Sequence, residues 1–215
     1  MWTVFLANWN KEWVNSPPPA IKRSNGPLPC DTMKILITGG TGFLGGATAI
    51  RLKKLGHEVT VIGRSVTAGN FLEEKGVCFL KADIRDRTTV VRACKGMQAI
   101  IHCAALASPW GKYQDFYDAN VLGTRHVLQG ALEYQVPRFV NLSTPSVYFD
   151  YQHRVNIKES DPLPQIVATH YAGTKRIADT LVSVLANALL VSLSLRKWIG
   201  KMVPDHGKNA RTKPY

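Results

Sequence analysis

Apolar runs of strand length alternate with helical patterns through the middle of the chain. The strand-like runs are KILIT, EVTVI, VCFLKA, QAIIHCA, RFVNLS and ALLVSLSL. Between them lie the helical patterns FLGGATAIRLKKLG, short ones near NFLEEKG and TTVVRACKG, a long one through DFYDANVLGTRHVLQGALEYQ, and one in ATHYAGTKRIADT. Runs such as KILIT are apolar on both faces, which is typical of parallel strands covered by helices on each side. We therefore predict an α/β domain, a doubly wound, Rossmann-type parallel sheet of about six strands.

The two ends of the chain lack this alternation. Residues 1–32 contain NSPPPA and NGPLP and no sustained period, so we expect a disordered or loosely attached extension. Residues 33–195 carry the predicted dinucleotide-binding domain, and residues 196–215 form a basic irregular tail. No stretch has the pattern of a secretion signal. The most apolar run, at 181–195, is shorter than the ~20 residues that span a bilayer. No membrane span is expected.

Composition excludes some classes of function. The 215 residues contain 45% hydrophobic residues, enough for a globular core, and 4 cysteines without a CxxC pair. Neither a zinc site nor a disulfide framework is indicated, and a reduced, cytoplasmic setting fits best. The net charge is +12, but the tail alone contributes six Lys or Arg against one Asp. Without interleaved aromatic residues this favours a solvated tail over a specific nucleic-acid site.

A glycine-rich segment, TGGTGFLGG at 38–46, joins the first predicted strand to the first predicted helix. Such glycines permit a tight turn, let the backbone approach a pyrophosphate, and bring the helix close to the strand. Amide groups at the start of the helix then face the negative phosphates. Two spacings overlap here, Gly40-x-Gly42-x-x-Gly45 and Gly39-x-x-Gly42-x-x-Gly45. The cofactor-binding residues expected in this segment are Gly39, Thr41, Gly42, Phe43, Leu44 and Gly45.

The end of the second predicted strand bears on the choice of dinucleotide. An acidic residue at this place favours NAD, because it binds the ribose hydroxyls. Here the strand ends in EVTVIGRS, with Gly63 and Arg64 at that place. A guanidinium group suits a 2′-phosphate. We therefore expect NADP as the cofactor, with NAD as the alternative.

Six short pieces of the chain together resemble a known family: TGGTGFLGG, ADI at 82–84, HCAA at 102–105, NVLGT at 120–124, LSTPSVY at 142–148 and YAGTK at 171–175. In this order and at these intervals they resemble the extended short-chain dehydrogenase/reductase superfamily, of the NAD-dependent epimerase/dehydratase type. Within it the chain is most similar to the branch of 3β-hydroxysteroid-dehydrogenase-like proteins. The resemblance covers about residues 34–195.

The resemblance implies roles for particular residues. Gly39, Gly42 and Gly45 would contact the pyrophosphate. Asp83 and Ile84 would lie at the adenine, and Ala104 and Ala105 near the nicotinamide-side ribose. Tyr171 would be the catalytic acid and base, with Lys175 as its partner. Counting back from Val147 and Tyr148 places the catalytic hydroxyl at Thr144, with Ser143 as the runner-up, and Asn120 looks architectural.

Helix geometry agrees with the implied pair. Residues i and i+4 share a face, so the Lys175 ammonium can lie near the Tyr171 phenol and is expected to lower its pKa. Tyr171 and Lys175 would also contact the cofactor. For His102 and His170 we expect structural roles, because no second metal ligand or orienting carboxylate can be named. No metal site is predicted.

The implied activity is that of an NAD(P)-dependent oxidoreductase, which transfers hydride to or from a carbonyl or secondary alcohol of a small, steroid-like or otherwise hydrophobic substrate. The alternatives are a nucleotide-sugar epimerase or dehydratase, and a cofactor-binding module without turnover. The family normally continues into a small C-terminal substrate domain, whereas this sequence reads SLRKWIGKMV and ends at Tyr215. We therefore expect a truncated member that binds cofactor, turns over poorly, and self-associates or dimerises through exposed apolar faces.

Overall fold

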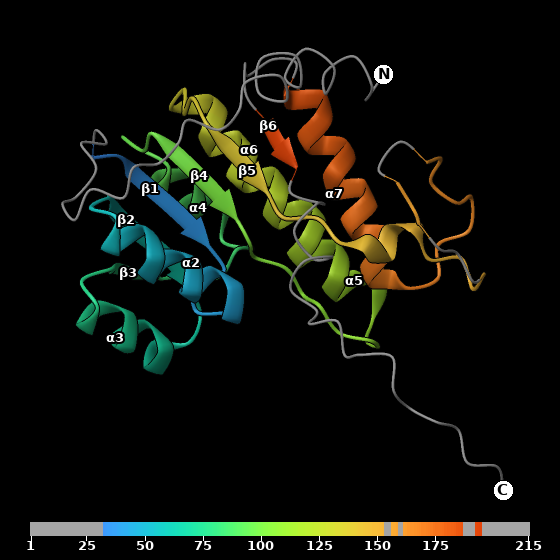
Figure 1. Ribbon diagram of the computed structural model, residues 1–215, viewed down its shortest axis with the longest axis horizontal. Coiled ribbons are helices and arrows are strands. Elements are labelled where there is room, and N and C mark those ends of the chain that lie inside the picture. Colours follow the sequence, from blue (N-terminus) through green and yellow to red (C-terminus); the bar gives the residue numbers. More distant parts are fainter. Residues whose placement is uncertain (1–31, 153–155, 159–160, 187–191, 195–215) are drawn as a thin grey trace, which may run out of the picture.

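Six parallel strands form the centre of the molecule (Figure 1). The computed structural model describes residues 32–152, 156–158, 161–186 and 192–194. The strands lie in the order β3-β2-β1-β4-β5-β6. Their bounds are β1 Lys34–Thr38, β2 Glu58–Gly63, β3 Cys78–Lys81, β4 Ala99–His102, β5 Phe139–Asn141 and β6 Ser192–Ser194. The predicted doubly wound parallel sheet is confirmed.

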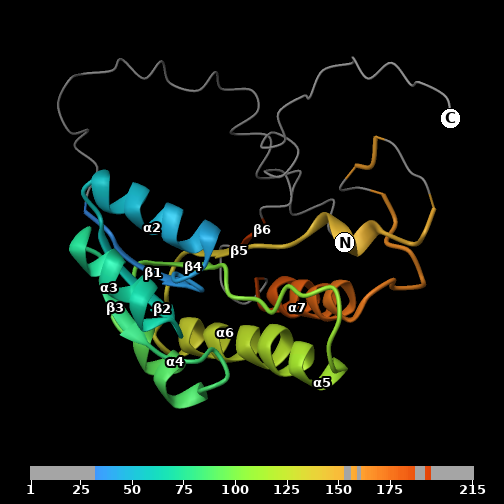
Figure 2. The same ribbon diagram turned by 90° about the horizontal axis from the view of Figure 1, so that it is seen from below.

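Helices cover both faces of this sheet (Figure 2). Their bounds are α2 Phe43–Lys54, α3 Val66–Glu74, α4 Arg87–Ala93, α5 Tyr113–Phe116, α6 Gly123–Glu133 and α7 His170–Ala186. Three of them, α3, α4 and α7, follow a residue that supplies a side-chain cap, which for α7 is Thr169, whose hydroxyl accepts from the amide of Ala172. Ser65 accepts a hydrogen bond from the amide of Ala68, and Asp86 accepts one from the amide of Thr89. Such caps satisfy amides that have no partner within the helix.

Alternating side chains of the strands supply two cores, one on each face. On one face Ile35 and Ile37 pack with Ala49 of α2 and Leu72 of α3. On the other face the buried cluster draws on β1, β2, α4, β4, α6, β5 and α7 and contains Leu36, Ile62, Val90, Cys94, Ile100, Val127, Leu128, Ala131, Val136, Phe139 and Val182. Because both faces of the central strands β1 and β4 are covered, these two strands are apolar on both faces, as the sequence indicated.

The long helix expected after β4 is not a single α-helix. The turns between α5 and α6 form a π-helix, η1, over Tyr117–Leu122. The predicted long helical segment is confirmed, but the apolar period of the sequence did not reveal the wider turn within it. Asn120, within η1, is buried and hydrogen-bonds to Leu106 and Thr174. Widened turns of this kind recur at functional sites.

The carboxyl ends of the strands gather most of the predicted site residues at one edge of the sheet. β1 leads into the glycine turn, β4 into Ala104, and β5 into Thr144, which precedes a short 3-10 helix, η2, at Pro145–Tyr148. The order reverses between β1 and β4, since β1 connects outward to β2 and β4 to β5. Ligands of open α/β sheets bind at such a switch point.

The predicted segments at the two ends of the chain lie almost entirely outside the described residues. Residues 1–31 of the expected extension and the whole expected tail, 196–215, lie outside the described residues. Within the described ranges, none of the helices combines the length and apolar character that a bilayer crossing needs.

Candidate cofactor and active site

The glycine turn between β1 and α2 makes a close approach to the segment after β4. Gly39 has a φ of 69°, in the left-handed region that favours glycine. A Cβ atom at Gly39 would lie 2.7 Å from the backbone nitrogen of Ala104. The turn is closed by a 3.0 Å hydrogen bond from the Gly42 amide to the Gly39 carbonyl. Gly39 therefore allows the two strand ends to meet.

Gly42 and Gly45 differ in what surrounds them. A Cβ at Gly45 would lie 2.4 Å from the Gly39 carbonyl oxygen, against the backbone of the turn itself. At Gly42 the nearest such atom is that same oxygen at 3.2 Å, and Gly42 is exposed with an extended φ of −89°. Gly45 thus serves the packing of the helix on the turn, whereas the open side at Gly42 leaves room for a ligand.

The start of α2 is free to bind an anion. Gly42 makes no side-chain cap, and the first turn contains no acidic residue. Phe43, the first helical residue, is 92% exposed, while Leu44 is half-buried. The N-terminus of a helix attracts negative charge through its unpaired amides and its dipole. The turn and the helix start therefore fit the pyrophosphate of a dinucleotide.

Gly63, at the end of β2, has no room for a side chain. A Cβ there would lie 2.3 Å from Oγ1 of Thr41, which covers the strand end. Arg64, the next residue, has a side chain that is 73% exposed. Its Nη1 lies 3.9 Å from Oδ2 of Asp83. The guanidinium group therefore lies near the predicted adenosine site.

Asp83 is held by a second arginine. Nε of Arg85 donates to Oδ1 of Asp83 at 3.0 Å, and Nη2 donates to Oδ2 at 2.7 Å. The hydrogen bonds from Arg85 lower the pKa of Asp83 to about 2. Ile84 packs against α6, because a Cβ at Gly123 would lie 2.9 Å from the Ile84 side chain. The Ile84 carbonyl lies 3.2 Å from Nδ1 of His126. Asp83 is thus a fixed anion with two cationic neighbours.

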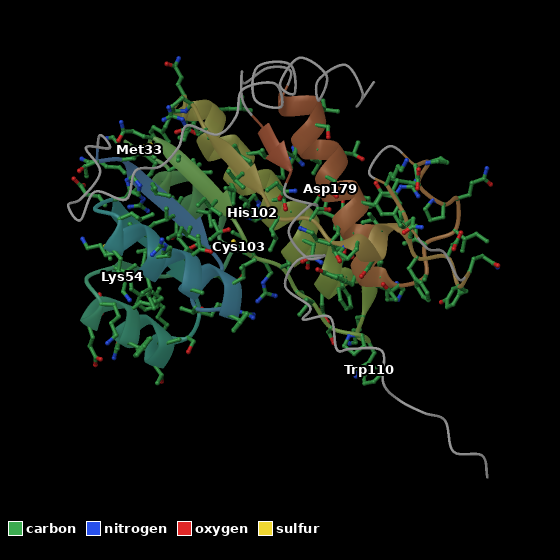
Figure 3. The ribbon with its side chains drawn as sticks, in the orientation of Figure 1. Met33, Lys54, His102, Cys103, Trp110 and Asp179 are labelled. Carbon is green, nitrogen blue, oxygen red and sulfur yellow. The ribbon has the colours of Figure 1, made fainter. Side chains whose placement is uncertain are left out.

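His102 links the ends of β1 and β4 by a buried chain of hydrogen bonds (Figure 3). Its Nδ1 lies 2.6 Å from Oγ1 of Thr38, and its Nε2 lies 2.9 Å from Oγ1 of Thr124. Thr124 donates its proton to the Asn120 carbonyl, so His102 must donate from Nε2 and accept at Nδ1. Burial lowers the pKa of His102 to about 3, which keeps the ring neutral. This environment matches the structural role expected for His102.

Asn120 joins the loop after β4 to α7. Its Oδ1 accepts from the amide of Leu106 at 2.7 Å, and its Nδ2 donates to Oγ1 of Thr174 at 3.0 Å. Thr174 immediately precedes Lys175. The loop that begins at Ala104, half-buried, and Ala105, exposed, is therefore fixed relative to Tyr171.

Thr144 and Tyr171 meet beside an apolar cavity. The Thr144 side chain is 6% exposed, and its hydroxyl donates to Oγ of Ser146 at 3.1 Å. Tyr171 lines a cavity of about 310 Å³ together with Ala107, Ser108, Pro109, Ser146, Phe149 and Thr169. The Tyr171 phenol at the wall of this cavity, with the Thr144 hydroxyl close enough to lower the pKa of Tyr171, can hydrogen-bond a carbonyl oxygen of a bound molecule.

Lys175 does not act on Tyr171 as the sequence led us to expect. Its side chain is 3% exposed, and Nζ donates to the carbonyl of Leu142 at 2.6 Å. Burial raises the pKa of Tyr171 above its ordinary value, the Thr144 hydrogen bond lowers it, and Asp179 raises it. The expected lowering of the Tyr171 pKa by Lys175 is therefore wrong, because the buried ammonium is directed to a backbone carbonyl.

Ser143, the alternative to Thr144, is turned to a different partner. Its hydroxyl donates to Oδ2 of Asp179, and the Asn141 side chain donates to Oδ1 of Asp179 at 2.9 Å. Sequence reasoning missed Asp179, although its place one helical turn beyond Lys175 was a usable signal. Among the described residues, no group of three His, Cys, Asp or Glu could hold a metal ion.

The parallel sheet, the glycine turn at its switch point and the open helix start define a dinucleotide-binding domain. The chain belongs to the NAD dependent epimerase/dehydratase family, whose sequence model matches residues 35–213. The resemblance inferred from the sequence is thereby confirmed at the level of the family.

Curated relatives include reductases. The chain is 37% identical to 2-alkyl-3-oxoalkanoate reductase of Stenotrophomonas maltophilia over 76% of this chain and 50% of that protein. It is 34% identical to 3beta-hydroxysteroid-dehydrogenase/decarboxylase isoform 1 of Arabidopsis thaliana over 59% of this chain and 28% of that protein. The chain thus spans about half the length, or less, of these relatives.

Among solved structures, UDP-glucose 4-epimerase of Thermus thermophilus in complex with NAD is similar. The two share 29% identity with a TM-score of 0.68, over 76% of this chain and 54% of the epimerase. The fold of the family is therefore present across the described sheet.

Proposed function

We propose that this protein is an NADP-preferring oxidoreductase that interconverts a hydrophobic ketone and its secondary alcohol. The observation that carries this proposal is the Tyr171 phenol at the wall of an apolar cavity, with the buried Thr144 hydroxyl beside it. The relatives named as reductases of 2-alkyl-3-oxoalkanoates and dehydrogenases of 3β-hydroxysteroids support the same class of substrate.

The cofactor would be held at the carboxyl edge of the sheet. The amides at the start of α2 and the open side of Gly42 would hold its pyrophosphate, with Phe43 exposed beside them. Arg64 would bind a 2′-phosphate, because the space at Gly63 is filled by Thr41 and offers no acid for ribose hydroxyls. The 3.9 Å distance between Nη1 of Arg64 and Oδ2 of Asp83 supports a place for Arg64 beside the proposed adenosine site.

The residues of the chain would supply binding, orientation and a proton. The bound nicotinamide would supply or accept the hydride. Thr144 would donate a hydrogen bond to the substrate oxygen and stabilise negative charge as it develops there. Tyr171 would transfer its phenolic proton to that oxygen in reduction and accept one in oxidation. The apolar wall of the cavity would exclude water around the reacting carbonyl.

A second candidate is epimerisation of a nucleotide sugar. It is favoured by the similarity to UDP-glucose 4-epimerase of Thermus thermophilus. The apolar lining beside Tyr171, with Ala107, Pro109 and Phe149, favours a hydrophobic substrate instead. A cofactor-binding protein without turnover is the third outcome that the assay can return.

The test has two assays of the full chain: NADPH oxidation with an alkyl ketone or an oxosteroid, and, because epimerisation consumes no reduced cofactor, analysis of the sugar nucleotide after incubation of UDP-glucose with the oxidised cofactor. We expect ketone-dependent oxidation that disappears in Tyr171→Phe, while Tyr113→Phe, at an exposed ring outside the cavity lining, retains it. Interconversion of UDP-glucose and UDP-galactose without ketone reduction would favour the epimerase. Cofactor binding with no turnover of any substrate would overturn the proposed enzymatic function.

A further inference from the structure

The helix α7, which bears Tyr171 and Lys175, also bears a buried carboxylate. Asp179 is 3% exposed and lies one turn after Lys175 and two turns after Tyr171 on α7, on the side that faces the sheet (Figure 3). Burying a charge is costly unless the charge is paired and hydrogen-bonded. Neither the glycine turn nor the contact between Thr144 and Tyr171 accounts for a carboxylate at this place.

The hydrogen bonds of Asp179 run to the segment that carries Thr144. Asn141, the last residue of β5, donates to Oδ1 at 2.9 Å, and Ser143 donates to Oδ2. Asn141 and Ser143 are both fully or almost fully buried, at 0% and 4% exposure. The carboxylate therefore fastens both ends of a short segment to the helix that bears Tyr171. Thr144 follows immediately.

The same segment receives the lysine. Nζ of Lys175 donates to the Leu142 carbonyl at 2.6 Å, between the two donors to Asp179. One helix thus presents an ammonium and a carboxylate to consecutive residues of one strand end. These contacts of Asp179 and Lys175 together fix the position of Thr144 relative to Tyr171.

Several other ionisable groups surround Lys175. Burial lowers the pKa of Lys175, and Asp179 and then Cys103 raise it. Cys103 is a protonated thiol near neutral pH, because burial raises its pKa to about 11. His102, at the end of β4, stays neutral, and Tyr171 is a neutral phenol. Among the described groups that raise the pKa of Lys175, Asp179 is therefore the one that supplies negative charge.

We propose that Asp179 is a positioning residue for the active site: its buried carboxylate anchors the strand end that carries Thr144 to α7, and its negative charge compensates that of the buried Lys175 ammonium, which binds the same strand end at Leu142. Asp179 acts through these neighbours and need not touch substrate. The importance of this role for catalysis rests on the proposed function, whereas the anchoring of the strand end and the compensation of the Lys175 charge do not.

The experiment measures the titration of Lys175 by NMR in the full chain without cofactor. The 13Cε signal of Lys175 is assigned by its loss in Lys175→Met. Asp179→Asn keeps an oxygen that can accept from Asn141 but removes the charge. We expect the midpoint of Lys175 to fall by about one pH unit or more in Asp179→Asn, and to stay near that of the wild type in Asp179→Glu. Asp161→Asn, at a half-buried carboxylate that caps the amide of Lys158, is the matched control.

The outcomes distinguish a failure of this proposal from a failure of the proposed function. An unchanged Lys175 midpoint in folded Asp179→Asn would overturn the proposal, whatever the enzyme assay returns. A lowered midpoint supports it even if no ketone is reduced, in which case only the proposed function fails. If reduction is found, the alkaline limit of its pH profile should move to lower pH in Asp179→Asn and remain unmoved in Asp161→Asn.

Asp179→Asn could fail to fold because it leaves a buried ammonium without its counter-charge. The double variant Lys175→Met with Asp179→Asn removes both charges. The proposal then predicts that the double variant folds, since the unpaired charge is gone. An unfolded double variant together with a folded Lys175→Met would contradict the pairing of the two groups.

Discussion

The glycine turn offers a sharp prediction, because the space for a side chain is filled by backbone atoms at Gly45 and is largely open at Gly42. A Cβ at Gly45 would lie 2.4 Å from the Gly39 carbonyl oxygen, and both other near atoms are also backbone. Backbone cannot move aside as the end of a flexible side chain can. Gly45→Ala should therefore destabilise the protein by about 1–3 kcal/mol, the usual cost of overpacking.

At Gly42 the corresponding distance to the same oxygen is 3.2 Å, and the backbone is extended. Gly42→Ala should cost below about 1 kcal/mol, because only a helix-cap preference changes. In a domain of this size about 1 kcal/mol moves Tm by ~2–4 °C. Gly45→Ala should thus lower Tm by ~2–12 °C, and Gly42→Ala by less than ~4 °C.

Cofactor binding should separate the two positions. Gly42→Val places branched carbons on the open side of the turn, where the pyrophosphate is proposed to lie, and should abolish NADPH binding in a folded protein. Circular dichroism melts and NADPH fluorescence titrations on all three variants give both quantities. Retention of wild-type affinity in folded Gly42→Val would refute the assignment of the turn, and an unchanged Tm in Gly45→Ala would refute the packing argument.

Three further predictions concern the cofactor, the catalytic hydroxyl and pH. In fluorescence titrations of both reduced cofactors, Arg64→Ala should remove a preference for NADPH over NADH, and an unaltered preference would exclude Arg64 as the 2′-phosphate ligand. Thr144→Ala should lower kcat by about 10²–10³-fold, and a larger loss in Ser143→Ala would reverse the choice of hydroxyl. Because burial lowers the pKa of His102 from 6.5 to about 3, the unfolded chain binds a proton there that the folded one does not. The free energy of unfolding should therefore fall as pH drops from 6.5 toward 3, by up to about 1.4 kcal/mol per unit. Denaturant titrations at several pH values should find that this free energy depends less on pH in His102→Gln, whereas His170→Gln should leave the dependence unchanged.

Much of the fold could be predicted because its signals are local. The apolar runs of β1 and β4 are continuous, and the glycine turn follows β1 directly, so strand, turn and helix could be predicted in order. The π-helix at Tyr117–Leu122 could not be predicted, since it depends on contacts of Asn120 with residues on two other segments.

The site was predictable in its residues and less so in its electrostatics. The spacing of Tyr171 and Lys175 gives a shared helix face but not the depth of burial. The pKa of Tyr171 is raised because desolvation outweighs the Thr144 hydrogen bond, and Lys175 is directed to the Leu142 carbonyl. Burial and the partner of an ammonium follow from tertiary packing, which no local pattern records.

The most direct test of the proposed function follows the hydride itself. The full chain is incubated with NADPH deuterated at the nicotinamide C4 and with a long-chain alkyl ketone, and the alcohol is analysed by mass spectrometry. The account predicts alcohol with deuterium on its carbinol carbon, and none when Tyr171→Phe replaces the wild type. Mass spectrometry accumulates product over hours, so slow turnover is still detected. Absence of labelled alcohol from wild type that binds NADPH would contradict the account.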